Sequence, residues 1–332
     1  MKNKYSVFVH VGAGSHSLSN FSTYKSVMEN ACKAAIKALE EGSSSSAAVT
    51  IAIKILEDDP VTNAGIGSNL TRSGTVECDA SIMCSKTGAF GAVGSVSAIK
   101  NPICAAKSIM DNESLGQQEI GLIYPMLLVG KGGEIWAKNN NIECTDDKSY
   151  HITVLFILNA SSKTELVDNG LLQDTVGAIC LDRYGDISSG VSSGGIALKY
   201  EGRVGEAAIY KAGCWAQKFY DSDQIKVVGA SVTGTGEQII RSSVAENYST
   251  QVASNIDLPI NQLQKLLLQF LDDPMLQKYS KKNVGIILMI NNEIKDGAIT
   301  ELLAGHTTDT MGYGYMSNNM IHPKVMSLFS IY

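Results

Sequence analysis

The stretch Leu172-Gln173-Asp174-Thr175-Val176-Gly177-Ala178 decides the fold, because a polar, irregular segment meets a buried-looking strand there. Residues 175–181 alternate like a strand, a turn follows at 182–186, and a second strand runs into 190–195. If the peptide bond before Thr175 were cut, the threonine would carry a free α-amine. Such an amine has a pKa of about 7.7–8.0 and can serve as general base for the hydroxyl of the same residue. Thr175 is therefore either a self-activated nucleophile or only the first residue of a strand.

The composition excludes several classes of protein. The chain has 332 residues, of which 44% are hydrophobic and 18% charged, which is enough for a large core. A net charge of -6 argues against a general nucleic-acid binder. The sequence contains no apolar run long enough for a membrane span, and the short run at 7–11 lacks a signal-peptide cleavage site. Seven scattered cysteines without a C-x-x-C pair predict free thiols and no zinc site.

Hydrophobic spacing predicts strands and helices in both halves of the chain. We expect helices over 23–41, 46–56, 237–248 and 259–271 and from 101 onward, strands over 7–11, 90–99 and 225–231, a hairpin of 284–290 with 293–300, and a final strand within 306–316. These elements do not alternate as βαβ units, so the sequence predicts an α+β fold with a largely antiparallel sheet. Residues 151–158 could form another strand. Residues 159–173 are expected to be an exposed connector, as self-cleavage at Thr175 would require.

Three polar or glycine-rich segments are candidates for chemistry. Asp79 precedes the apolar run 80–83, so its carboxyl needs a hydrogen-bonding partner. The glycine-rich turn at 232–237 connects a strand to a helix, where backbone N–H groups can stabilise an oxyanion, although a plain tight turn has the same pattern. The single His306 is interpreted as structural rather than as a metal ligand.

Five separate motifs together resemble the type-2 asparaginase branch of the N-terminal-nucleophile hydrolases. They are Asn63-Ala-Gly, Asp174-Thr175-Val-Gly-Ala, Val191-Ser-Ser-Gly-Gly195, Gly202-Arg-Val-Gly205 and Thr233-Gly-Thr-Gly-Glu237. Within that branch the chain resembles the threonine aspartases, or taspases, through residues 63–69, 76–83, 191–199, 213–216 and 306–317. The resemblance covers nearly the whole chain, from His10 to Ser317.

The resemblance implies a fold and a maturation step. It implies a four-layer αββα sandwich in which two antiparallel sheets lie between layers of helices. Residues 1–332 would be a single catalytic domain that cuts itself between Asp174 and Thr175. The products would be an α chain, 1–174, and a β chain, 175–332, and the two-chain unit is expected to pair into a dimer of heterodimers.

The resemblance also implies roles for particular residues. Thr175 is the expected nucleophile, and Ser193, 18 residues later, takes the place of a threonine whose hydroxyl contacts the nucleophile in asparaginases. Arg203 should grip the substrate carboxylate as a planar bidentate donor, with Gly205 and Glu206 beside it. Expected in the oxyanion hole are Thr233 and Gly234, and expected close to the scissile bond are Gly12, Gly14 and Asn63.

Glu206 departs from both related patterns. Asparaginases have an aspartate at this position, three residues after the arginine, and use it to hold the free amine of the substrate. Taspases lack that acid. Since glutamate is one methylene longer than aspartate, it would have to fold back to reach the same amine. We therefore expect Glu206 only to tune the activity.

The resulting functional prediction is a threonine endopeptidase that cleaves protein substrates after aspartate, with trithorax-type chromatin regulators and the transcription factor IIA precursor as implied partners. The alternative is an isoaspartyl peptidase or L-asparaginase that acts on small substrates. A silent relative that only binds partners is disfavoured by the intact Thr175, Ser193 and Arg203, and glycosylasparaginase by the missing signal peptide. No metal or organic cofactor is expected, and the resemblance allows a structural sodium ion held by backbone carbonyls near residues 56–65. The location is expected to be cytoplasmic or nuclear, although residues 151–174 lack a basic import run.

Overall fold

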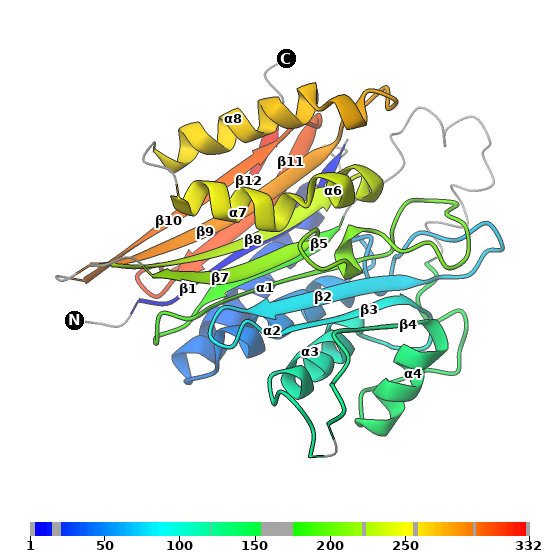
Figure 1. Cartoon of the computed structure of the whole chain (residues 1–332). Coiled ribbons are helices and arrows are strands. Elements are labelled where there is room, and N and C mark those ends of the chain that lie inside the picture. Colours follow the sequence, from blue (N-terminus) through cyan, green and yellow to red (C-terminus); the bar gives the residue numbers. More distant parts are fainter. Residues whose placement is uncertain are drawn as a thin grey trace.

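The computed structural model describes residues 4–14, 21–119, 121–153, 175–220, 224–254, 258–294 and 297–329. The predicted connector over 159–173, Asp174 and most of the strand considered over 151–158 lie outside these residues. Twelve strands and seven α-helices are described (Figure 1). The predicted α+β class is therefore confirmed.

The larger sheet has eight strands in the order β12-β11-β1-β5-β6-β2-β3-β4. Its neighbours pair antiparallel, except β3 and β4, which are parallel. The strands are β1 (Ser6–Gly14), β2 (Cys78–Cys84), β3 (Phe90–Val96), β4 (Leu127–Val129), β5 (Val176–Leu181), β6 (Ile187–Ser193), β11 (Thr310–Ser317) and β12 (Lys324–Phe329). Segments from both sides of Thr175 thus share one sheet.

The smaller sheet has four antiparallel strands in the order β10-β9-β8-β7. These strands are β7 (Cys214–Tyr220), β8 (Ile225–Gly234), β9 (Val284–Ile294) and β10 (Gly297–His306). The predicted hairpin of 284–290 with 293–300 is confirmed as the β9–β10 pair. Strand β8 contacts β1, β5 and β6, so the two sheets pack against each other.

Two hydrophobic cores hold the helices against the sheets. In the first core, the helices α1 (Phe21–Glu40), α2 (Ser45–Glu57) and α3 (Pro102–Glu113) pack on the larger sheet. The second core lies between the sheets and extends to α7 (Val244–Ser254) and α8 (Pro259–Asp272), which lie over the smaller sheet in Figure 1. Strand β1 serves both cores, because Val7 and Val9 belong to the first and Phe8 to the second.

Some elements differ from the sequence prediction. The strand predicted within residues 306–316 corresponds to β11. It is not the last strand of the chain, because β12 follows it and pairs with it. The helix predicted over 237–248 is two helices, α6 (Gly236–Ser242) and α7, since Ser243 adopts a left-handed conformation with φ of 44°. The sequence analysis did not predict α4 (Gly130–Asn139), β4 or β7.

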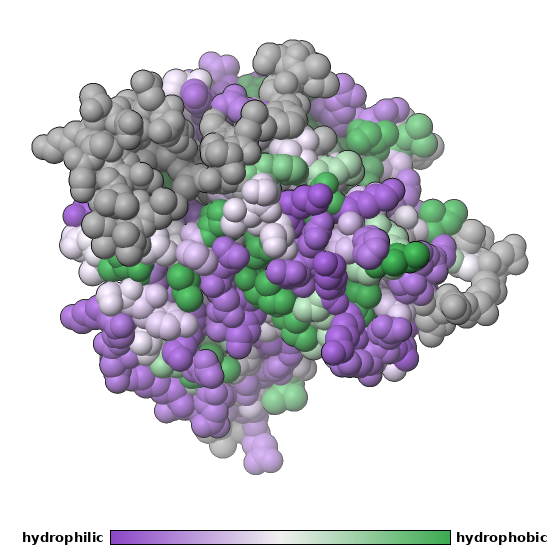
Figure 2. Space-filling model, turned by 180° about the vertical axis from the view of Figure 1, so that it is seen from behind, coloured by the Kyte–Doolittle hydropathy of each residue, from purple (hydrophilic) through white to green (hydrophobic). Residues whose placement is uncertain are grey.

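The surface is mixed where it can be seen. On the face drawn in Figure 2, hydrophobic residues lie in small groups among hydrophilic ones. Among the helices that the structure describes, none combines the length and the hydropathy that crossing a lipid bilayer requires. All seven cysteines lie in described segments and are free.

Candidate active site

The β5–β6 hairpin brings Thr175 and Ser193 together. Val176 pairs with Ser192 in antiparallel register, so the next pair outward is Thr175 with Ser193. Both residues stand at the same end of the hairpin, and the Oγ atoms of the two side chains are 3.1 Å apart. The predicted contact between nucleophile and Ser193 therefore follows from the pairing of two adjacent strands.

A second polar group lies closer to the nucleophile. The Thr175 hydroxyl donates a hydrogen bond to Glu206 Oε1, at 2.7 Å. Thr175 has 1% of its surface exposed and Glu206 has 3%, so water does not screen the contact. The sequence analysis expected Glu206 at most to tune activity, whereas the structure places its carboxyl directly on the candidate nucleophile.

Burial sets the charge state of Glu206. Glu206 begins a short 3₁₀ turn, Glu206–Ala208, that packs against β2, β3 and β6. Removal from water raises the pKa of its carboxyl to about 7, although the hydrogen bond from Thr175 and the charge of Arg203 favour the ionised form. The carboxyl is therefore able to take up or release a proton near neutral pH.

The side chains of Arg203 and Glu206 lie beside each other over Gly236, which has no Cβ to occupy that space. A Cβ on Gly236 would be 2.7 Å from Glu206 Oε2 and 2.8 Å from Arg203 Nη2. Glu237 accepts two hydrogen bonds from the guanidinium, from Nε at 2.9 Å and from Nη2 at 2.8 Å. The edge formed by Nη1 and Nη2 can still face a ligand. Glu237 belonged to a quoted motif, but the sequence analysis gave it no role.

Asn63 supports the turn that follows Ser193 and does not touch Thr175 directly among the contacts described. Its side-chain NH2 group donates to the Gly195 carbonyl at 2.9 Å, and its backbone carbonyl accepts the N–H of Gly194 at 2.8 Å. The Gly195 N–H in turn donates to Ser193 Oγ at 2.9 Å. Asn63 therefore fixes the position of Ser193 through the 194–195 backbone.

Two buried charges brace the loop that carries Arg203. Asp79 accepts the backbone N–H groups of Ser95 and Gly205, each at 2.8 Å, so the carboxyl has the partners that its position demanded. Lys199 donates to the Gly194 carbonyl at 2.8 Å and also to the Glu77 carbonyl. Burial raises the pKa of Asp79 and lowers that of Lys199, while each charge favours the ionised form of the other. Gly205 thus holds Asp79 by its backbone.

The predicted oxyanion residues lie at the end of β8. Thr233 is fully buried, and its hydroxyl accepts the backbone N–H of Ala13 at 3.3 Å. Gly234 has a φ of +133°, and a Cβ there would lie 2.3 Å from the Asn283 carbonyl oxygen. Gly12 has a φ of 127° at a register shift in β1, so glycine is required there as well. The roles of these residues toward substrate stay predictions.

Gly14 lies at the end of β1, where its carbonyl accepts the Thr310 hydroxyl at 3.1 Å. His10 lies in the same strand and was not singled out from the sequence. Its Nε2 is 2.8 Å from Ser231 Oγ, and a Cβ on Gly177 would lie 2.4 Å from Nε2. Burial lowers the pKa of His10 to about 3, so the imidazole is neutral. It therefore packs under β5 as an uncharged hydrogen-bonding group.

The segment expected to bind sodium has a suitable set of oxygens. Thr62 Oγ1 lies near the carbonyl oxygens of Leu56, Asp59 and Ala64, at 2.6, 3.3 and 3.5 Å. One hydroxyl hydrogen cannot serve three acceptors, and carbonyl oxygens are ligands that hard cations prefer. These contacts are hydrogen bonds of Thr62 and do not test for a cation, so the sodium ion stays a proposal.

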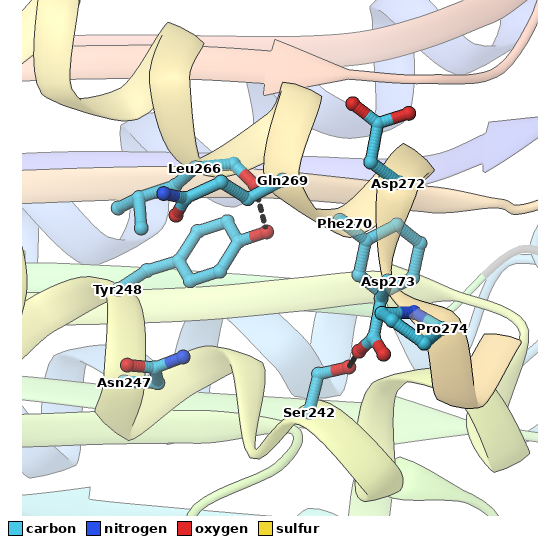
Figure 3. A pocket seen from close by; sticks show the side chains of 9 residues that line it. All are labelled: Ser242, Asn247, Tyr248, Leu266, Gln269, Phe270, Asp272, Asp273 and Pro274. Carbon is cyan, nitrogen blue, oxygen red and sulfur yellow. Dashed lines mark hydrogen bonds between the residues drawn. The ribbon is translucent and has the colours of Figure 1, made fainter.

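A separate cavity is not lined by Thr175, Ser193, Arg203 or Glu206. It has a volume of about 330 Å³ and lies beside α7 and α8. Figure 3 shows the Tyr248 hydroxyl in this cavity directed at the Leu266 carbonyl, to which it donates at 2.8 Å, and Ser242 close to Asp273. In the described residues no three His, Cys, Asp or Glu side chains are grouped as a metal site would require. The Thr175 cluster is therefore the candidate active site.

Comparison with known proteins identifies the class. The family model described as asparaginase matches residues 3–320, so the chain belongs to this family of N-terminal-nucleophile hydrolases. It is 32% identical to a plant-type L-asparaginase of Pyrococcus horikoshii, over 96% of this chain and 98% of that protein. It is 31% identical to an isoaspartyl peptidase of Salmonella typhimurium, over 73% and 77%. An isoaspartyl peptidase of Escherichia coli is 32% identical, over 72% and 74%.

These findings correct the functional prediction. The prediction of an endopeptidase that cleaves proteins after aspartate is wrong, because these relatives are named isoaspartyl peptidase or L-asparaginase. Nothing in the comparisons supports the placement among the taspases. The expected partners, chromatin regulators and a transcription factor precursor, depended on that activity and are not carried further. The motifs at 63–65 and 202–205 were informative about the family but not about the branch.

Proposed function

We propose that the protein is an isoaspartyl peptidase and L-asparaginase whose nucleophile is Thr175. The observation that carries the proposal is the pairing of opposite charges beside the nucleophile. Glu206 Oε1 is 2.7 Å from the Thr175 hydroxyl, and Glu206 and Arg203 converge on Gly236. Asparagine and isoaspartyl peptides have a free α-carboxylate and a free α-amine next to the amide that is hydrolysed. An arginine and a carboxylate at fixed positions match these two groups.

The arginine can bind the substrate carboxylate while Glu237 holds it. Glu237 uses Nε and Nη2, which fixes the plane of the guanidinium. The second edge remains for a bidentate contact with a carboxylate. The Glu206 carboxylate is the matching group for the substrate amine. This arrangement favours the substrates in the names of the relatives, because an α-linked aspartyl residue inside a protein has no free amine.

Maturation by self-cleavage is part of the proposal. Thr175 precedes β5, and its hydroxyl already contacts two polar side chains. Cleavage at the 174–175 bond would release an α-amine on Thr175, which would then serve as general base for its own hydroxyl. Chains 1–174 and 175–332 would remain one domain, since both contribute strands to the larger sheet.

We also propose that the layers of the molecule form the αββα sandwich typical of N-terminal-nucleophile hydrolases. Its support is the packing of α1–α3 on the larger sheet, of the smaller sheet on the other side, and of α7 and α8 beyond (Figure 1). In this arrangement Thr175 and Ser193 lie at one end of the β5–β6 hairpin, where β5 begins and β6 ends.

A substrate panel tests the proposed function. Purified protein, after self-cleavage is complete, is incubated with L-asparagine, an isoaspartyl-leucine dipeptide and an α-linked peptide with an internal aspartate, and products are identified by mass spectrometry. We expect hydrolysis of the first two and not of the third. Thr175→Ala is the matched control and should be inactive on all of them. Fully cleaved protein that hydrolyses neither β-linked substrate would refute the proposal.

A further inference from the structure

We infer that Glu206 is the general base that activates the Thr175 hydroxyl for self-cleavage of the uncut chain. This inference rests on the self-cleavage that we propose above, and it adds a role to the same site. Before cleavage the nitrogen of Thr175 is an amide and cannot accept a proton, so the residue lacks the base that it has afterwards. Some other group must take the hydroxyl proton.

The geometry singles out Glu206 for this task. Its Oε1 accepts the hydroxyl hydrogen at 2.7 Å, within the range required of a general base. The other described partner of the hydroxyl is Ser193 at 3.1 Å, and a serine is a very weak base. Both side chains are buried, so a solvent molecule does not take the place of the carboxylate.

The surrounding charges keep this carboxyl near the protonation state it needs. The charges that act on it are Arg203, which favours the ionised carboxylate, and Asp79 on β2, which opposes it, while Glu237 on α6 is bound to Arg203. Asp79 is occupied by two backbone N–H groups. Burial raises the pKa of Glu206 to about 7, close to the optimum for a base that works at neutral pH.

The reaction balances with water as the only co-reactant. The Thr175 hydroxyl oxygen forms a bond to the carbonyl carbon of Asp174 while its proton passes to Glu206. The proton then moves to the Thr175 nitrogen as the carbon–nitrogen bond breaks, which leaves an ester and a free amine. A water molecule gives a proton to Glu206 and attacks the ester carbon. The bond between the ester carbon and Thr175 Oγ1 breaks as the proton returns from Glu206 to Oγ1. The products are a free N-terminal Thr175 and the Asp174 carboxylic acid, which releases the second proton of the water to solvent at neutral pH.

Two variants separate this role from the binding of a substrate amine. Glu206→Gln keeps the size of the side chain but removes both the basic oxygen and the charge. Glu206→Asp keeps the charge but, being one methylene shorter, loses the 2.7 Å contact with Thr175. The matched control is Glu201→Gln, because Glu201 is exposed in the same loop and its carboxyl accepts hydrogen bonds from Ser73 and Thr71 rather than from the Thr175 cluster.

The experiment follows precursor made by cell-free synthesis, with the cut and uncut chains separated by denaturing electrophoresis. We expect wild-type self-cleavage to accelerate as pH rises from 5.5 to 8.5 with an inflection near 7. Glu206→Gln should be slowed at least about 100-fold, with that inflection lost. Glu206→Asp should be slowed about tenfold or more, because its shorter carboxyl no longer reaches the Thr175 hydroxyl. The control should match wild type.

The outcomes separate this inference from the proposed function. Self-cleavage of Glu206→Gln at the wild-type rate overturns the inference. A wild-type rate that does not change with pH also overturns it, and this measurement does not depend on whether the variants fold. Wild-type protein that cuts itself with the expected pH profile but hydrolyses neither asparagine nor isoaspartyl dipeptide supports the inference and defeats the proposed function. A slow Glu206→Gln that keeps the wild-type pH inflection assigns the base elsewhere and overturns the inference.

Discussion

Thr175 and Glu206 are joined by a hydrogen bond of 2.7 Å across 31 residues of sequence, in a place from which water is almost excluded. From the motifs alone we expected this glutamate only to tune the activity. In the structure, the same carboxyl is in contact with the candidate nucleophile and shares the space over Gly236 with Arg203. In the roles that we propose, this one residue would act both in self-cleavage and on the substrate.

Removal of the nucleophile should abolish both activities. Denaturing electrophoresis of wild-type protein should show two fragments, residues 1–174 and 175–332, whereas Thr175→Ala should remain one chain, because no side-chain oxygen remains to attack the Asp174 carbonyl. Thr175→Ser keeps that oxygen and should still cut itself, although more slowly because serine is less restricted at χ1. Two fragments from the alanine variant would exclude Thr175 as the nucleophile of self-cleavage.

Arg203→Ala should weaken substrate binding more than it weakens the fold. The change deletes a charge-assisted contact with the substrate carboxylate, worth roughly 1.5–3 kcal/mol, so kcat/KM on an isoaspartyl dipeptide should fall about ten- to 150-fold. Arg241→Ala is the control, since Arg241 is an exposed arginine of the neighbouring helix α6. Thermal unfolding within a few degrees of wild type would show that the fold survives. An unchanged kcat/KM would remove Arg203 from the site.

The stability of the protein should depend on Glu57, a buried carboxyl under β6. Its Oε1 accepts the Ser192 hydroxyl at 2.6 Å and the Ile103 N–H at 3.0 Å, and burial raises its pKa from 4.5 to about 8. Between these values the folded chain holds a proton that the unfolded chain has released. The free energy of unfolding should therefore fall as pH rises from about 4.5 to about 8, by at most about 1.4 kcal/mol per pH unit from this group.

Glu57→Gln checks this dependence, because its side chain stays neutral in both states. Urea unfolding at several pH values should show a flatter dependence for Glu57→Gln than for its parent. The two proteins to compare are Thr175→Ala and the double variant Thr175→Ala/Glu57→Gln, because each of them is one uncut chain. Glu206 titrates in the same range and remains in both proteins, so the comparison isolates Glu57. Parallel curves for the two proteins would show that Glu57 is ionised in the folded chain.

The sequence was most informative where contacts are local. The family resemblance matched Ser193 to Thr175, and the structure gives the local reason for the match, since both residues belong to one hairpin in antiparallel register. The contacts of Arg203 with Glu237 and of Thr175 with Glu206 join a loop to other elements, and a loop's path is not encoded in periodicity. The specificity was misjudged for a related reason. The motifs that suggested taspase identify the family. Substrate specificity depends on side chains such as Glu206, whose position beside Thr175 only the fold shows.

The missed elements have physical explanations as well. Helix α4 begins Gly-Lys-Gly-Gly, which is a poor helix sequence, and it forms because Ala137 is buried in the first core. Strand β4 has three residues, and two of them are exposed at the edge of the sheet, so it shows no alternation. Strand β12 lies at the opposite edge and is defined by its pairing with β11. Tertiary contacts, and not local propensity, create these three elements.

Gly236→Ala should damage function while leaving the fold nearly intact. The new Cβ would lie 2.7 Å from Glu206 Oε2 and 2.8 Å from Arg203 Nη2. These two atoms are at the ends of side chains and can move aside, and the backbone nitrogen of Glu206, at 3.1 Å, needs to shift by only a few tenths of an ångström. Alanine is also a better helix residue than glycine at the start of α6. Moving the two side chains, however, displaces the carboxyl from the nucleophile and the guanidinium from the substrate. We expect self-cleavage and kcat/KM each to fall at least about tenfold, with the melting temperature within a few degrees of wild type.

Gly132→Ala is the matched control, because Gly132 lies inside helix α4 with no atom within 4 Å of a new Cβ. It should leave both activities unchanged and stabilise the protein by about 0.5–1 kcal/mol, as expected for glycine replaced by alanine in a helix. Self-cleavage is read by electrophoresis, kcat/KM by product analysis and stability by thermal unfolding. If Gly236→Ala keeps wild-type rates in both assays, the close approach of Glu206 and Arg203 at this glycine has no functional importance, and the charge pairing that supports the proposed function loses its basis.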